Sequence, residues 1–375
     1  MRPPADADGR DCTRCYAAPV TAYERVVGVA GWSGSGKTTL LERVVPALVA
    51  DGLSVVVVKH DAHGLALDVA GKDSDRLFRA GAEVVVDAPA ERLVRERLHG
   101  EESWEARLVA LQRRYDLVLV EGHKGGRHPK VWLLGPGEST PPADVGEVLE
   151  VLPWDGERAA AVSEIVTQRL AQAWAAAPRR AGILVGGASR RMGAPKQWLR
   201  VDGETLLART ARAIAAAGPL ALLGDPGVPL GIDEAARSST TSIADDALAT
   251  AVRLADAPGV RGPLAGILAA LRWDPVSWLI ASCDLPRLRA GAVEWLLAQR
   301  RPGCWAVLPR AGGVVQPLLA IYEPQALPLL ETLAVEGAPG PSRLEGHAHV
   351  ATPEPPPEIA DCWRGVNTPE ELAAL

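Results

Sequence analysis

Two glycine-rich segments hold the residues of this chain best suited to binding phosphate groups. Residues 31–38 read G-W-S-G-S-G-K-T, and residues 186–196 read G-G-A-S-R-R-M-G-A-P-K; a short apolar run precedes each. Small residues let successive backbone N–H groups approach a phosphate, and basic side chains neutralise its charge. Because only the first segment ends in G-K-T, the sequence predicts two nucleotide-binding loops of different type.

The first segment satisfies the G-x-x-x-x-G-K-[ST] pattern of a P-loop. Gly34 and Gly36 let the backbone curl, so that its amides and the N-terminus of the next helix, near Thr39, face a β-phosphate. Lys37 supplies a positive charge, and the hydroxyl of Thr38 is a candidate magnesium ligand. These five residues are the predicted nucleotide contacts of the first half.

Two carboxylates follow the next apolar strands of the first half. Asp61 comes after a run at residues 53–58, and Glu121 follows a run at residues 116–120. Since the carboxyl ends of parallel strands meet at one edge of a sheet, both are candidate magnesium ligands or water-orienting groups. His60 and His63 flank Asp61 and are equally consistent with ordinary loop histidines.

The second segment is the more basic of the two. Arg190, Arg191 and Lys196 are suited to a triphosphate whose leaving group is pyrophosphate, because guanidinium and ammonium groups neutralise phosphate oxygens. We therefore predict that Arg191 and Lys196 act in catalysis at this loop. A solvated basic loop is the alternative.

A single carboxylate follows the apolar run at residues 278–282. It belongs to Asp284 in the sequence C-D-L-P, and it is the predicted magnesium ligand and third catalytic residue of the second half. Magnesium usually takes one or two carboxylates together with substrate phosphates. The alternative is that Asp284 caps a helix near Leu288.

Strands and helices must alternate to position these loops. In the first half, apolar runs at 26–30, 53–58 and 116–120 alternate with helical stretches, which predicts a parallel sheet. The rhythm restarts at 182–185 after an Ala-rich helix at 159–177. The predicted fold class is α/β, with two doubly wound domains: a P-loop domain at 25–178 and a Rossmann-like domain at 179–375. Residues 1–24 are the predicted flexible leader.

Composition excludes several classes of protein. A formal charge of -6 over 375 residues argues against a nucleic-acid partner. No apolar run reaches the ~20 residues of a membrane span, and no secretory signal precedes the first strand, so we expect a soluble cytoplasmic protein. Five scattered cysteines do not form a disulfide framework. Cys12 and Cys15 lack the further ligands of a zinc site and belong to the leader.

The first half resembles the P-loop protein of molybdopterin-guanine dinucleotide biosynthesis from about residue 26 to 130. Beside the P-loop, the resemblance includes K-H-D-x-H at 59–63, G-K-D-S at 71–74 and V-E-G-x-K at 120–124. Members bind GTP and assist the guanylyltransferase. The resemblance implies a GTP-binding adaptor that is at most a weak GTPase. Because the chain has no N-K-x-D guanine-reading motif, the guanine preference of this half rests on the resemblance alone.

The second half resembles molybdenum cofactor guanylyltransferases from about residue 181 onward. The family's L-A-G-G-x-S-x-R-M-G-x-x-K aligns with 184–196, with Val185 in place of alanine; G-P-L-A-G is at 262–266, C-D-x-P at 283–286 and N-T-P-E-x-L at 367–372. Asp225 stands where the family often has asparagine. The resemblance implies nucleotide contacts by Leu184, Val185, Gly186, Gly187, Lys196, Asp225, Asp256 and Asp284.

The reaction implied by the resemblance transfers GMP from GTP to molybdenum-molybdopterin and releases pyrophosphate. The substrates are then GTP and molybdenum-molybdopterin, Mg²⁺ is the cofactor, and molybdoenzymes or their chaperones receive the product. Two related activities remain open from the residues alone. One is a cytidylyltransferase acting on the same pterin, and the other is a sugar-phosphate nucleotidyltransferase.

Overall fold

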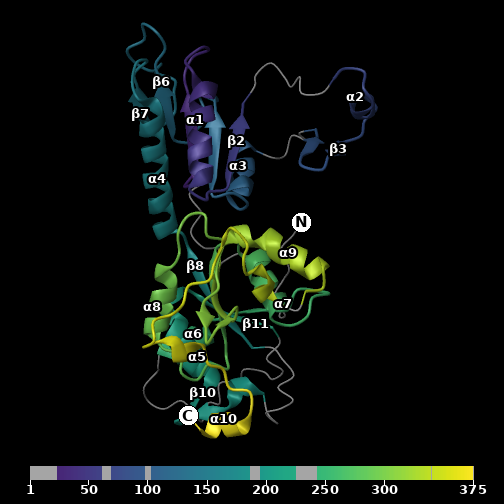
Figure 1. Cartoon of the computed structure of the whole chain (residues 1–375), viewed down its shortest axis with the longest axis vertical. Helices are drawn as coiled ribbons and strands as arrows, with labels where there is room; N and C mark the ends of the chain where they lie inside the picture. Colours follow the sequence, from purple (N-terminus) through teal and green to yellow (C-terminus); the bar gives the residue numbers. More distant parts are fainter. Residues whose placement is uncertain are drawn as a thin grey trace. The chain divides into compact units, whose positions relative to one another are not determined.

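The computed structural model describes residues 23–60, 69–97, 103–185, 195–224, 243–338 and 340–374. Residue contacts divide the chain into two compact units (Figure 1). The first is built from Thr21–Leu48 and Val55–Val166, and the second mainly from Thr167–Leu375. The division lies inside one helix, and the domain boundary after residue 178 stays a prediction. Residues 1–22 of the predicted leader lie outside the described residues.

The first unit contains a five-stranded sheet in which every paired strand is parallel. Its order is β2-β5-β1-β6-β7. Strands β1, β5 and β6 are buried throughout, as expected of apolar strands covered on both faces. The strands are β1 Val26–Ala30, β2 Val55–Lys59, β5 Leu117–Glu121, β6 Lys130–Leu133 and β7 Val148–Leu152. This arrangement confirms the predicted parallel sheet.

Helices cover this sheet. Leu108 of α3 (Trp104–Gln112) packs against Val26 and Val118 on one face. Helix α1 (Lys37–Ala50) follows the P-loop and buries one apolar stripe, formed by Leu40, Leu41, Val44 and Leu48. Helix α4 (Arg158–Ala176) begins in the first unit and continues into the second. A separate two-stranded sheet pairs β3 (Val84–Asp87) with β4 (Arg92–Arg95), next to α2 (Asp73–Arg79).

The second unit contains a seven-stranded mixed sheet of order β12-β11-β8-β13-β17-β14-β18. Strands β8, β11, β12 and β13 are parallel, and β17 runs antiparallel to both β13 and β14. The strands are β8 Arg179–Leu184, β11 Leu220–Leu223, β12 Val252–Leu254, β13 Ser277–Ser282, β14 Ala306–Val307, β17 Leu319–Tyr322 and β18 Val350–Ala351. The four parallel strands bring the predicted site residues toward one sheet edge.

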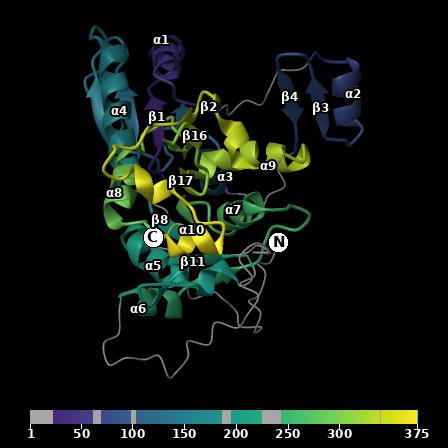
Figure 2. The ribbon, with the colours of Figure 1, turned by 60° about the horizontal axis from the view of Figure 1, so that its bottom comes forward.

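Two groups of helices cover opposite faces of this sheet (Figure 2). Helices α5 (Leu206–Ile214) and α8 (Ala290–Ala298) contribute to one core, with α6 (Ile243–Ala249) beside α5. Helices α7 (Pro263–Trp273) and α9 (Leu327–Val335) contribute to the other. The predicted fold class, two α/β units, is confirmed. No helix in the described part of the chain has the length and apolarity that crossing a bilayer requires.

Short elements complete the second unit. A hairpin of β9 (Arg200–Val201) and β10 (Glu204–Thr205) follows η1 (Lys196–Trp198), and β15 (Arg310–Ala311) pairs with β16 (Val314–Val315). Helix α5 ends at Ile214, and the chain continues as the 3₁₀ turn η2 (Ala215–Ala217). The remaining elements are η4 Pro324–Ala326, η5 Pro341–Leu344, η6 Ala360–Trp363 and α10 Pro369–Ala373.

Candidate functional site

Lys196 and Asp284 meet in the second unit, although 88 residues separate them in the chain. The Nζ atom of Lys196 donates to Asp284 Oδ2 at 2.8 Å and to Asn367 Oδ1 at 3.0 Å. Both charged side chains are largely shielded from solvent, at 18% and 21% exposed. An ammonium group held between two oxygens in this way is positioned to meet a polyphosphate. The structure thus brings together two of the three predicted catalytic residues.

The second oxygen of Asp284 is also held. Ser282 Oγ, at the end of β13, donates to Asp284 Oδ1 at 2.6 Å. The backbone oxygen of Asp284 accepts from Val366 N at 3.0 Å, which fixes the segment carrying Asn367 beside it. Asp284 does not cap the following helix, because α8 begins after Arg289. Ser282 and Asn367 were not predicted as site residues, although Asn367 opens the N-T-P-E motif.

Cys283 lies between Ser282 and Asp284 in the chain, and its side chain is buried. Burial raises the pKa of its thiol to about 12, and the neighbouring carboxylate of Asp284 acts in the same direction. The sulfur is therefore a neutral S–H group near neutral pH. It contributes to packing and is a poor nucleophile.

The other predicted contacts are placed differently. Leu184 ends β8 and Val185 follows it, and both side chains are buried, so only their backbone atoms are available to a ligand. Asp256 follows β12 and is exposed. Its Oδ1 atom lies 3.6 Å from the point where a Cβ of Gly266 would stand, so α7 approaches this loop closely. Four other predicted residues fall outside the described residues: Gly186, Gly187, Arg191 and Asp225.

The oxygens around Lys196 suit magnesium. Asp284 provides a carboxylate and Asn367 an amide oxygen, both directed at one cationic group. Hard oxygen donors of this kind, with one carboxylate completed by waters and substrate phosphates, are the usual magnesium environment. Across the described ranges no group of three or more His, Cys, Asp or Glu side chains could hold a metal on its own.

The P-loop of the first unit has the predicted backbone. Gly34 and Gly36 have φ values of 80° and 83°, in the left-handed region that glycine adopts readily. The Nζ atom of Lys37 donates to the backbone oxygens of Gly31 at 3.0 Å and Trp32 at 2.8 Å. Burial lowers the pKa of Lys37. The ammonium is thus held across the loop, where a phosphate would compete for it.

A hydroxyl and a carboxylate meet beside the P-loop. Thr38 Oγ1 donates to Glu121 Oε1 at 2.9 Å, and Lys59 Nζ lies 3.7 Å from the same oxygen. The structure therefore brings together Thr38 and Glu121, two of the predicted magnesium ligands of this half, and their oxygens suit that ion. Thr39 lies exposed in the first turn of α1. Asp61 lies outside the described residues.

Arg158 contacts the P-loop, and the sequence did not predict this contact. From the first residue of α4, its Nη1 atom donates to the backbone oxygen of Ser35 at 2.9 Å. The same guanidinium also donates to Pro153 O at 2.6 Å and to Leu134 O. It therefore connects the P-loop to the ends of two neighbouring strands.

His60 belongs to an aromatic cluster at the edge of this sheet. Its ring centroid lies 4.5 Å from that of His123, which lies 4.5 Å from that of Trp104. Beyond them, His128 is fully buried, and neither ring nitrogen has a hydrogen-bond partner among the residues that the structure describes. Burial, together with the positive charge of Lys130, lowers the pKa of His128 to about 4. His63 lies outside the described residues.

Family models match both halves of the chain. A model described as molybdopterin guanine dinucleotide synthesis protein B matches residues 26–149. A second model, described as a MobA-like NTP transferase domain, matches residues 181–350.

Individual relatives divide in the same way. The chain is 41% identical over 113 residues to a molybdopterin-guanine dinucleotide biosynthesis adapter protein of Haemophilus influenzae, covering 29% of this chain and 62% of that protein. It is 35% identical over 124 residues to the adapter protein of Escherichia coli, covering 32% of this chain and 71% of that protein. It is 33% identical over 204 residues to a probable molybdenum cofactor guanylyltransferase of Synechococcus elongatus, covering 52% of this chain and 95% of that protein.

Proposed function

The chain belongs to the molybdopterin guanine dinucleotide synthesis protein B family in its N-terminal half and to the molybdenum cofactor guanylyltransferase family in its C-terminal half, and from this we propose that one polypeptide joins a GTP-binding adaptor to a guanylyltransferase. The observation that carries the enzymatic assignment is the Lys196–Asp284 pair, held at 2.8 Å where the four parallel strands direct their carboxyl ends.

The proposed reaction is a nucleotidyl transfer. The terminal phosphate of molybdenum-molybdopterin attacks the α-phosphorus of GTP, the bond to the β-phosphate breaks, and pyrophosphate leaves. The product is the guanine dinucleotide form of the cofactor. Such reactions need little covalent chemistry from the protein, because positioning and charge neutralisation supply most of the barrier lowering.

Lys196 and Asp284 have complementary roles in this proposal. Lys196 neutralises charge that develops on the triphosphate, and its contacts with Asp284 and Asn367 hold the ammonium group in place. Asp284 is also the proposed magnesium ligand, with Asn367 beside it, and an ion held there would help to neutralise phosphate charge. Ser282 orients the Asp284 carboxylate through its 2.6 Å hydrogen bond. Arg191 is proposed to contact the triphosphate from the glycine loop.

The N-terminal half is proposed to bind GTP and to present substrate or product to partner proteins in the cytoplasm, where GTP is made. Lys37 and the P-loop amides contact the phosphates, while Thr38 and Glu121 would hold a magnesium ion. GTP hydrolysis at this site is proposed to be weak at most. The proposed recipients of the finished cofactor are molybdoenzymes or their chaperones.

The test uses the full chain with molybdenum-loaded molybdopterin, magnesium and either GTP or CTP. Pyrophosphate release and the mass of the product are measured. Dinucleotide with GTP and not with CTP is the expected result, whereas product with CTP alone would overturn the guanylyl assignment. Lys37→Ala is the matched control, because it alters the first nucleotide site and leaves the transferase residues intact.

A further inference from the structure

Lys196 and Asp284 lie on two separate segments of the chain, and these segments must be held at a fixed distance from each other. Lys196 lies in η1, which leads directly into the β9–β10 hairpin. Asp284 lies in the loop after β13, and Pro286 follows it by two residues. The Lys196–Asp284 contact depends on the distance between these segments.

Helix α5 begins where the hairpin ends and returns the chain toward both segments. The side chain of Thr205 accepts a hydrogen bond from Ala208 N and thereby caps the helix. Leu206 N donates to Leu199 O at 2.8 Å, which ties the first turn of α5 to the end of η1. The hairpin turn is tight, because Asp202 has a φ of 53°.

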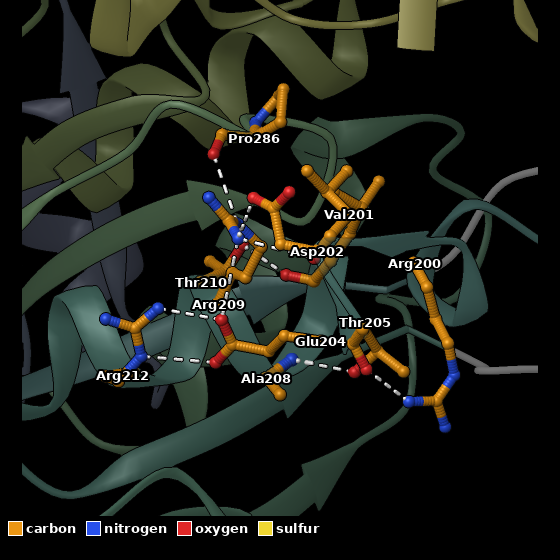
Figure 3. A network of polar contacts seen from close by, with 12 residues as sticks. Arg200, Val201, Asp202, Glu204, Thr205, Ala208, Arg209, Thr210, Arg212 and Pro286 are labelled. Carbon is orange, nitrogen blue, oxygen red and sulfur yellow. Dashed lines mark hydrogen bonds and ion pairs between the residues drawn. The ribbon is translucent and has the colours of Figure 1, made fainter. Parts of the chain in front are cut away.

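Arg209 lies one turn into α5 and reaches both segments (Figure 3). On the hairpin side, its Nη1 atom lies 3.4 Å from Val201 O and 3.5 Å from Asp202 Oδ2. On the other side, its Nε atom donates to the backbone oxygen of Pro286 at 3.3 Å. One guanidinium group therefore connects the segment after Lys196 to the loop after Asp284.

We infer that Arg209 is a positioning residue for the Lys196–Asp284 pair in the proposed transfer reaction. Arg209 acts on this pair by holding their two segments together. A planar guanidinium with fixed donor directions suits this task better than a flexible ammonium group. Misplacement of a catalytic group by about 1 Å can reduce the rate on the order of 100-fold, so a loosened connection should be visible in turnover.

Arg212 provides a matched control on the same helix. Its guanidinium donates to Glu204 through Nε at 3.1 Å and through Nη2 at 2.7 Å (Figure 3). Glu204 also faces Arg209, at 3.7 Å. Arg212→Ala therefore perturbs the same hairpin and removes the same charge, while it leaves the connection to the Asp284 loop in place.

The experiment compares Arg209→Ala, Arg209→Lys and Arg212→Ala in the full chain. We expect kcat to fall about 10- to 100-fold in Arg209→Ala, with KM for GTP changed less than about threefold. Arg209→Lys should recover little, and Arg212→Ala should stay within about twofold of the unmodified chain. Equal losses in Arg209→Ala and Arg212→Ala would overturn the inference.

A double-mutant cycle tests whether Arg209 acts through Lys196. In a Lys196→Ala background, Arg209→Ala should reduce kcat much less than it does alone, because the group it positions is gone. Full additivity of the two losses contradicts the inference. Titration of magnesium–GTP by calorimetry adds a readout that needs no turnover: the Kd of Arg209→Ala should stay within about threefold of the Kd of Arg212→Ala, because Arg209 positions the catalytic pair and does not bind the nucleotide. Failure of the unmodified chain to form product would instead refute the proposed function.

Discussion

Arg158 Nη1 donates to the backbone oxygen of Ser35 at 2.9 Å and so supports the P-loop from outside. A phosphate-binding loop directs its amides inward, and its carbonyls must find donors elsewhere. Arg158 provides such a donor from the first residue of α4, beyond the segment that the N-terminal family model matches.

Replacing Arg158 should therefore weaken nucleotide binding in the first unit. We expect Arg158→Ala to raise the Kd for GTP about tenfold, in line with the loss of a hydrogen bond from a charged donor. Binding is measured by calorimetry in a Lys196→Ala background to suppress the second site. Arg43→Ala, an exposed charge removal on α1, is the control and should leave the Kd unchanged.

Lys196 should be required for turnover. Lys196→Ala is expected to reduce kcat at least about 100-fold, as the loss of a charge-stabilising donor does in other active sites. Steady-state pyrophosphate release gives the measurement. Turnover near the normal rate in this variant would remove Lys196 from the mechanism.

The carboxylate of Asp284 should set the magnesium requirement. Asp284→Asn is expected to raise the magnesium concentration for half-maximal activity at least about tenfold, because the anionic ligand is lost. Ser282→Ala removes only the 2.6 Å hydrogen bond to Oδ1 and should have a smaller effect in the same direction. Magnesium titrations of the two variants that coincide with the unmodified chain would argue against Asp284 as the ligand.

Replacing Lys37 should distinguish the function of the P-loop site from that of the transferase site. Lys37→Ala is expected to reduce GTP binding at the P-loop at least about tenfold and to leave kcat of transfer within about twofold. Delivery of the finished cofactor to an acceptor enzyme should fall. If transfer by the purified variant collapsed as well, the first unit would be part of the catalytic cycle.

The lowered pKa of His128 predicts that the free energy of unfolding falls in mild acid. Its pKa is lowered to about 4 in the folded chain, whereas an unfolded histidine titrates near about 6.5. Between these values the unfolded chain binds more protons, so the free energy of unfolding decreases as the pH falls from 6.5 to 4. The full decrease is about 3 kcal/mol, and it levels off below that window.

Hydrogen exchange of peptides from β1 and β5 at pH 5 and pH 7.5 measures this change. The two strands lie next to each other in the sheet of the first unit, and β1 carries Gly28 against the His128 ring. His128→Gln should flatten the pH dependence. A dependence that persists unchanged in this variant would assign it to other groups.

The sequence predicts the positions of the two glycine-rich loops and their carboxylates better than it predicts the contacts that support them. The P-loop pattern and the placement of Glu121 and Asp284 after apolar strands are local, because a strand followed at once by a polar residue delivers that residue to the sheet edge. The Thr38–Glu121 and Lys196–Asp284 contacts agree with this expectation. The two α/β units are predictable for the same reason, because the alternation of strands and helices is also a local pattern.

The supporting residues were not predictable in this way. Asn367 approaches Lys196 across 171 residues of sequence, and Arg158 approaches Ser35 across 123. Neither position has a local pattern that indicates its partner, since both contacts depend on how distant elements pack. Arg209 reads in the sequence as one more charged residue of an amphipathic helix, and only its neighbours in space suggest its role.

Burial of the Cys283 thiol affects how readily this part of the protein is oxidised. Oxidants and alkylating agents attack thiolates, and the pKa of about 12 keeps this sulfur protonated beside the Asp284 carboxylate. A reactive cysteine at this position would link the proposed synthesis of the cofactor to the redox state of the cell. Because the sulfur is neutral and buried, we expect Cys283 to react only slowly with peroxide.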